Sequence, residues 1–132
     1  MRTKPCLTQV DVRKMLAACI AEAEKNDWEV TIAIVDDAGV LISLERMDGA
    51  PAISATVAPE KARTSALTKQ PTKFWEDRVK ERPAFANFPA GSLIQGAVPV
   101  IYDGECVGAI GVSGVQSTQD EQIARAGLTA LN

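Results

Sequence analysis

Hydrophobic residues along the chain follow two spacings, which predict helices in some segments and strands in others. Residues 8–25 carry apolar side chains at i, i+3 and i+4, with Thr8 as the N-cap and Asp11 as its capping-box partner. Residues 29–36 and 39–46 instead alternate or run continuously apolar, which is typical of strands. The turn residues between these two strands predict a β-hairpin.

Further helices are predicted in the middle and at the end of the chain. Residues 53–69 have a helical pattern, but proline is tolerated only in a first helical turn, so the secure helix is predicted to cover about residues 59–69. A short amphipathic helix is predicted over residues 72–82. The last helix is predicted to begin with Ser117 or Thr118 as its cap.

A second hairpin is predicted over residues 97–114, because Asp103 and Gly104 form a strong two-residue turn signal between two apolar segments. Both hairpins require antiparallel pairing, and helices lie between and around them. This order predicts an α+β fold, a sandwich in which helices pack on an antiparallel sheet. The length of 132 residues predicts one domain spanning residues 1–132.

Charge and composition narrow the classes of partner. The chain has 14 basic and 17 acidic residues, a net charge of -3, and no basic patch, so nucleic acid and anionic membranes are not expected partners. No apolar stretch approaches the roughly 18 residues that span a bilayer. The positive charge near Met1 is not followed by an apolar segment, so a secretory signal is not expected and a cytoplasmic location is predicted.

The absence of histidine excludes several kinds of site. It removes Ser-His-Asp and Cys-His catalysis as well as His-ligated zinc and haem. Cys6, Cys19 and Cys106 are too widely spaced to suggest a disulfide framework or a zinc pattern, so no metal site is predicted. Cys19 belongs to the apolar face of the first helix, and core packing is the favoured interpretation for Cys106.

The strongest polar constellation combines Arg46, Asp48, Lys61 and Thr64. Arg46 ends a strand, Asp48 follows it, and Lys61 and Thr64 share one helix face at i and i+3. Two cations and a hydroxyl there could hold a carboxylate, with Asp48 as a general base or as the partner of Lys61. The alternative is a structural ion pair that pins the loop to the helix.

Two other features have structural and functional interpretations. Glycines recur every third residue from Gly108 to Gly114, inside a predicted strand, which indicates close backbone packing; Ser113 could still present its hydroxyl to a pocket. Four aromatic residues gather between Phe74 and Phe88. They could line a pocket or form a lid, but a satellite core or a subunit contact is the favoured interpretation.

Several of these segments together resemble the GlcG/HbpS-like family, also described as haem-degrading-like domains, which is related to a domain of some corrinoid adenosyltransferases. The resemblance rests on Val35-Asp36 with Gly39, on the segments 46–50 and 61–66, and on the hairpin from Val98 to Gly114. It implies about five antiparallel strands flanked by helices, and assembly into dimers or higher oligomers. The chain departs from the family pattern at Pro59, at residues 95–97 and at residues 115–118, so the ligand does not follow from the resemblance.

The leading hypothesis is therefore a homo-oligomeric, small-molecule-binding domain without a cofactor. A small organic acid or another anionic metabolite would be held by Arg46 and Lys61, assisted by Thr64, Asp48 and Ser113. A second hypothesis adds chemistry on an oxo-acid, as an isomerase, tautomerase or lyase, with Asp48 or Lys61 moving a proton. A third is haem or corrinoid binding, in which iron would need Cys, Met, Tyr102 or a hydroxyl as its ligand. A purely structural role is the fourth.

Overall fold

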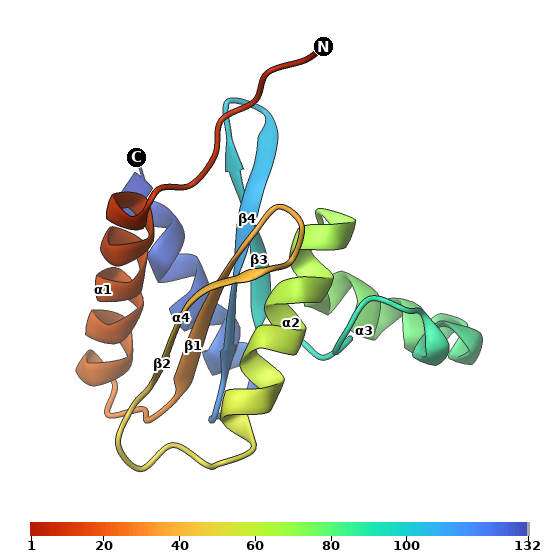
Figure 1. Cartoon of the computed structure of the whole chain (residues 1–132). Coiled ribbons are helices and arrows are strands. Elements are labelled where there is room, and N and C mark those ends of the chain that lie inside the picture. Colours follow the sequence, from red (N-terminus) through yellow and green to blue (C-terminus); the bar gives the residue numbers. More distant parts are fainter. Residues whose placement is uncertain (132) are drawn as a thin grey trace.

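A four-stranded antiparallel sheet lies between two layers of helices in the computed structural model, which describes residues 1–131 (Figure 1). The strand order is β2-β1-β4-β3. The strands are β1 (Thr31–Asp36), β2 (Leu41–Arg46), β3 (Ala97–Tyr102) and β4 (Glu105–Ser113). The α+β class and both hairpins are confirmed, but within the described residues the sheet has four strands and not about five.

Local turn chemistry explains both hairpins. The Asp36 carboxylate accepts hydrogen bonds from the backbone N–H groups of Ala38 (2.9 Å) and Val40 (3.0 Å), which closes the turn between β1 and β2. Asp103 and Gly104 both have positive φ, 51° and 76°, as a tight two-residue hairpin turn requires. The predicted turn residues therefore do form the turns.

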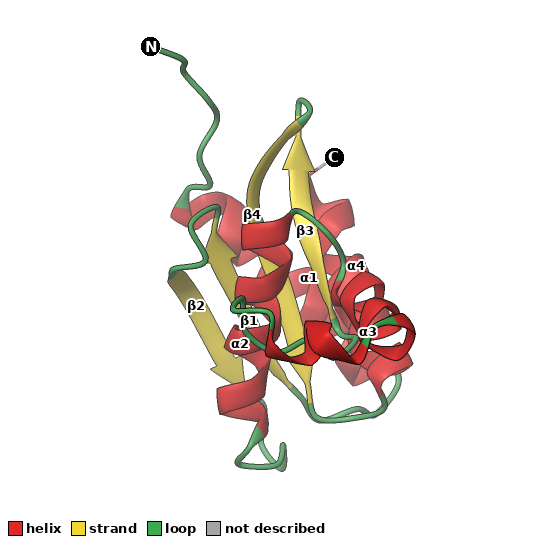
Figure 2. Ribbon diagram, turned by 90° about the vertical axis from the view of Figure 1, so that its right-hand side faces the viewer, coloured by secondary structure: helices red, strands yellow, loops and turns green. Residues whose placement is uncertain are grey.

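Helices cover the two faces of the sheet unequally (Figure 2). Helices α1 (Gln9–Lys25) and α4 (Ser117–Leu128) pack together on one face, and α2 (Ser54–Thr68) covers the other. Thr8 and Asp11 form the predicted capping box at the start of α1. The largest core lies between the sheet and the α1–α4 layer and includes Met15, Cys19, Ile32, Ile34, Val98, Ile110, Val112 and Ile123.

Close packing of α2 on the sheet depends on Gly111. A Cβ atom at Gly111 would lie 2.3 Å from the carbonyl oxygen of Ala58 and 2.6 Å from the backbone nitrogen of Ala62. Both contacts are with the backbone of α2, which cannot move aside as a flexible side chain can. The predicted structural interpretation of the glycine run is confirmed at this position.

Two predicted helix starts are wrong. Helix α2 begins at Ser54, near the start of the helical pattern at residue 53 but five residues before the predicted secure start, and Pro59 lies inside it. The hydroxyl of Ser54 makes a buried tertiary contact with the Thr31 hydroxyl (2.7 Å) and donates to the Pro51 carbonyl (2.5 Å) in the preceding turn, and we attribute the earlier start to these two contacts, which offset the hydrogen bond lost at Pro59. The N-cap of helix α4 is Gln116 and neither predicted residue, and its backbone N–H donates to the side-chain oxygen of Gln119 at 3.2 Å.

The segment after α2 extends away from the rest of the molecule (Figure 1). It consists of α3 (Thr72–Glu81) and the 3₁₀ helix η1 (Pro83–Asn87). We call residues 72–88 the aromatic arm. The indole N–H of Trp75 donates to the hydroxyl of Thr68 at 2.9 Å and so joins the arm to the end of α2. Within residues 1–131, none of the helices combines the length and apolar character needed to cross a bilayer.

Candidate functional site

The structure separates the predicted constellation into two places. Arg46 and Asp48 line one open pocket beside the edge strand β2. Lys61 and Thr64 lie instead on the buried face of α2, where the Lys61 ammonium reaches the backbone of Val112 in β4. Strand β1 lies between β2 and β4, so the two cations do not converge on one ligand in this arrangement.

Arg46 braces the loop that follows β2. Its Nε and Nη2 donate to the carbonyl oxygen of Ala50 at 3.2 and 3.0 Å. The guanidinium forms no ion pair with any residue of the described chain, although Asp48 lines the same pocket. Arg46 is exposed and is positioned by one carbonyl oxygen. Because no carboxylate pairs with it, its guanidinium can still bind an anion.

Lys61 forms a buried ion pair with Asp120 at the start of α4. The Lys61 Nζ lies 3.0 Å from Asp120 Oδ2 and donates to the Val112 carbonyl at 3.0 Å. Each side chain is only 3% exposed. Burial raises the pKa of the Asp120 carboxyl, and the neighbouring ammonium opposes that rise. This contact joins α2 on one face of the sheet to α4 on the other.

Asp120 was not identified by sequence reasoning. Asp120 lies in the first turn of α4, where an acidic residue is ordinarily explained by its interaction with the helix dipole. There was therefore no reason in the sequence to expect an ion pair with Lys61. Its second oxygen accepts a hydrogen bond from the backbone N–H of Val115 at 3.2 Å, so it also orders the turn before α4. Lys61 has Asp120 and not Asp48 as its carboxylate partner in the described structure.

Thr64 and Ser113 have different surroundings. Thr64 is fully buried, and its hydroxyl donates to the Glu60 carbonyl at 3.2 Å, one turn earlier in α2. Ser113 is half-buried at the end of β4. Thr31 pairs with Ser113 on one side and with Arg46 on the other, so Ser113 and Arg46 lie in one row across the sheet.

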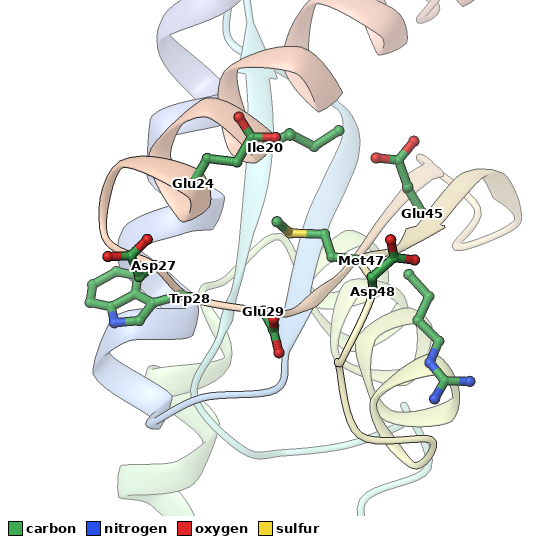
Figure 3. Close-up of a pocket in the computed structure, with 9 residues that line it drawn as sticks. Ile20, Glu24, Asp27, Trp28, Glu29, Glu45, Met47 and Asp48 are labelled. Atoms are coloured by element: carbon green, nitrogen blue, oxygen red, sulfur yellow. The ribbon is translucent and has the colours of Figure 1, made fainter.

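Arg46 and Asp48 belong to the acidic pocket, which we define by the nine residues drawn in Figure 3. Ile20 and Glu24 project from α1, Trp28 lies on the loop after α1, and Met47 extends between them from the loop after β2 (Figure 3). The cavity has a volume of about 740 Å³. Its carboxylates are Glu24, Asp27, Glu29, Glu45 and Asp48, and Arg46 is its one cationic lining residue.

A second cavity, the N-terminal pocket, lies where the N-terminal segment passes the β3–β4 hairpin. It has a volume of about 340 Å³. Cys6 and Tyr102 both line it, on elements nearly a hundred residues apart in the sequence. The remaining lining residues are Pro5, Leu7, Asp11, Val107 and Leu131. A smaller neighbouring cavity of about 210 Å³ shares Tyr102 and Leu131.

The three cysteines differ sharply in environment. Burial raises the pKa of the Cys19 thiol to about 12, and burial also raises the pKa of Cys106. Both are core residues, as predicted, while Cys6 is exposed. Within residues 1–131, no group of three or more Cys, Asp or Glu side chains is arranged to hold a metal ion.

Comparison with known proteins extends over nearly the whole chain. Residues 7–129 match the family model described as "Haem degrading protein HbpS-like". Protein GlcG of Escherichia coli strain K12 is 45% identical over 114 residues, which cover 86% of this chain and 85% of GlcG. The resemblance predicted from the sequence segments is confirmed.

Two solved structures have the same fold. A double mutant of HbpS from Streptomyces reticuli has a TM-score of 0.93 and 32% identity, covering 100% of this chain and 91% of that chain. A structure described as the PduOC:Heme Complex has a TM-score of 0.90 and 26% identity, covering 97% of this chain and 96% of that one.

Proposed function

This chain belongs to the HbpS-like family, and from that premise we propose that it binds haem in the N-terminal pocket. The observation that carries the proposal is that Cys6 and Tyr102 line the same pocket. Cysteine thiolate and tyrosine phenolate are both established axial ligands of haem iron. In a chain without histidine, these side chains are suitable donors, and a structural relative is described as a haem complex.

The remaining walls of the N-terminal pocket suit a flat, largely apolar macrocycle. Leu7, Val107 and Leu131 are its aliphatic lining residues. At about 340 Å³ this pocket would hold part of a haem group, and the rest would extend into the adjoining cavity of about 210 Å³. The adjoining cavity continues this surface along β3 through Pro99 and Ile101. Haem would supply an iron centre, and the chain would hold it and restrict the access of water.

The larger acidic pocket does not fit haem. Haem carries two carboxylates of its own, and the pocket presents five carboxylates against one guanidinium. Like charges this close repel unless counter-ions or cations separate them. Met47 could donate a thioether there, but the charge of the pocket opposes the ligand. The donor set therefore favours the N-terminal pocket.

The proposal is tested by titrating haemin into variants of the two candidate iron ligands. We expect Cys6→Ala or Tyr102→Phe to weaken binding at least about tenfold, since each removes an iron donor, and the ligand whose loss shifts the Soret band is the axial one. Glu45→Gln, in the acidic pocket, is the matched control and should bind haemin as the wild type does. Wild-type affinity in both variants and in their double mutant would refute this site.

A small organic acid at Arg46 is the second candidate, because this guanidinium has no ion-pair partner in the described chain. The carboxylates of the acidic pocket oppose this anion as they oppose haem, but a small monocarboxylate carries one negative charge and not two, and it could bond Arg46 directly. We expect Arg46→Ala to weaken binding of small hydroxy and oxo acids about tenfold in calorimetric titrations, because the variant lacks the carboxylate-binding group. Arg125→Ala is the control, since Arg125 already pairs with Glu121. Equal affinity for the acids in wild type and Arg46→Ala would remove this candidate.

Chemistry on an oxo-acid stays a prediction attached to the same pocket. Asp48 is exposed there, within the group of residues that includes Arg46. Lys61 is buried and held by Asp120, so it would reach such a substrate only after that pair opens. Of the two predicted proton carriers, Asp48 is therefore the more accessible.

A further inference from the structure

The aromatic arm has an apolar surface that the protein's own core does not use. Trp75 stacks on Phe88 with ring centroids 4.5 Å apart, and Phe85 lies 5.7 Å from Trp75. Phe74 and Phe88 remain 39% and 37% exposed. Neither of the two buried core clusters includes a residue of the arm. The rings pack on one another and present their outer faces to the surroundings.

Cations cover this aromatic surface. The guanidinium of Arg78 lies 5.5 Å from the Phe74 ring and 5.4 Å from the Phe85 ring, and that of Arg82 lies 5.2 Å from Phe85. Arg78 has only a long contact of 3.9 Å with Glu81. Neither Lys80 nor Arg82 forms an ion pair with a described residue. Arginine on an aromatic base is the composition typical of protein interfaces.

The acidic pocket has the complementary arrangement. Its floor is Ile20, Trp28 and Met47, all partly buried and packed against the main core. None of its five carboxylates forms an ion pair within residues 1–131. Unpaired like charges around one cavity repel one another, so a cation that enters relieves that repulsion.

The arm does not contact the acidic pocket of its own chain. It extends from the side of the sheet covered by α2, whereas the pocket lies between the end of α1 and the edge strand β2 (Figures 1 and 3). We propose that the aromatic arm of one copy docks into the acidic pocket of a second copy, with Arg78 and Arg82 entering among the carboxylates. Phe74 and Phe88 then cover Trp28 and Met47, which buries apolar surface on both sides.

Each arm–pocket contact joins two different surfaces of the same chain. Each copy carries one arm and one pocket, so two copies can exchange arms across a two-fold axis, or several can close a ring. The contact depends on charge as well as on apolar burial. Its strength therefore falls as added salt screens the interaction.

The test measures oligomeric mass by sedimentation for two charge-reversal variants of the full chain. The arm variant is Arg78→Glu/Arg82→Glu, and the pocket variant is Glu24→Lys/Asp48→Lys. We expect wild type to associate, more strongly at low salt, and each variant alone to dissociate with a dissociation constant raised at least about tenfold. Mixed in equal amounts, the two variants should associate again, because each reversed arm then meets a reversed pocket.

The control Lys14→Glu/Arg125→Glu changes net charge by the same amount as the arm variant, at exposed helix positions outside both surfaces, and should associate as wild type does. Circular dichroism of every variant verifies that it is folded. A monomeric wild type, a pocket variant of unchanged mass, or a mixture that stays monomeric would each overturn the proposal. An unchanged pocket variant beside a dissociated arm variant would indicate contact between two arms.

Discussion

Replacing Asp120 by alanine is expected to lower the free energy of unfolding by about 3–5 kcal/mol. The change leaves the Lys61 ammonium, whose side chain is 3% exposed, without its carboxylate partner. It also removes the acceptor of the Val115 N–H in the turn before α4. Urea denaturation followed by circular dichroism measures the loss directly.

Two further variants separate burial from ion pairing. Asp77→Ala breaks the Lys73–Asp77 pair, which has a similar 2.9 Å distance but is exposed, and should change stability by no more than about 0.5 kcal/mol. The double variant Lys61→Met/Asp120→Leu leaves no buried charge without a partner, so we expect it to be more stable than Asp120→Ala. An Asp120→Ala loss no larger than that of Asp77→Ala would contradict the structural role assigned to this pair.

Replacing Gly111 by valine is expected to destabilise the protein by about 3 kcal/mol or more, at the upper end of the cost of overpacking a core. The first added carbon would already lie 2.3 Å from the Ala58 carbonyl oxygen, before the branched methyl groups are placed. Helix α2 must therefore move off the sheet. The same denaturation measurement reports the cost.

Gly104→Ala is the control for adding a side chain to a glycine that no helix contacts. Gly104 lies directly before β4, but no atom lies within 4 Å of the position that an added Cβ would take, and only its positive φ of 76° opposes a side chain. That backbone strain costs about 1 kcal/mol. Equal losses in the two variants would show that close helix packing is not what Gly111 provides.

The fold was predictable because its signals are local. The helical spacing of residues 8–25 and the turn residues at 36–39 and 103–104 depend only on neighbours in the sequence, and each predicts an element that is present. Pro59 shows the limit of such reasoning. Its local cost predicts a helix start, but Ser54 gains buried contacts with Thr31, which lies on a different element.

The site was less predictable because its contacts join distant segments. Lys61 and Asp120 are 59 residues apart, and nothing in either segment indicates the other. Cys6 and Tyr102 share a pocket only because the N-terminal segment folds past the second hairpin. Sequence reasoning did identify which residue types could hold iron in a chain without histidine, but not where two of them meet.

The aromatic cluster was partly predictable from the sequence. Its composition favours a satellite core or a subunit contact over a pocket or a lid, and the four rings from Phe74 to Phe88 do gather into one packed group. The unpaired carboxylates that would receive it come from two separate stretches of chain, residues 24–29 and residues 45–48. Only the folded chain brings those charges around one cavity.

The central claim is that this member of the HbpS-like family binds haem, and an equilibrium titration of the wild-type protein with haemin tests it most directly. The Soret absorbance is followed as haemin is added to a fixed protein concentration. We predict a saturable change that ends at one haem per chain, as one N-terminal pocket per chain requires. Absorbance that matches free haemin at every step, without saturation, would contradict the claim.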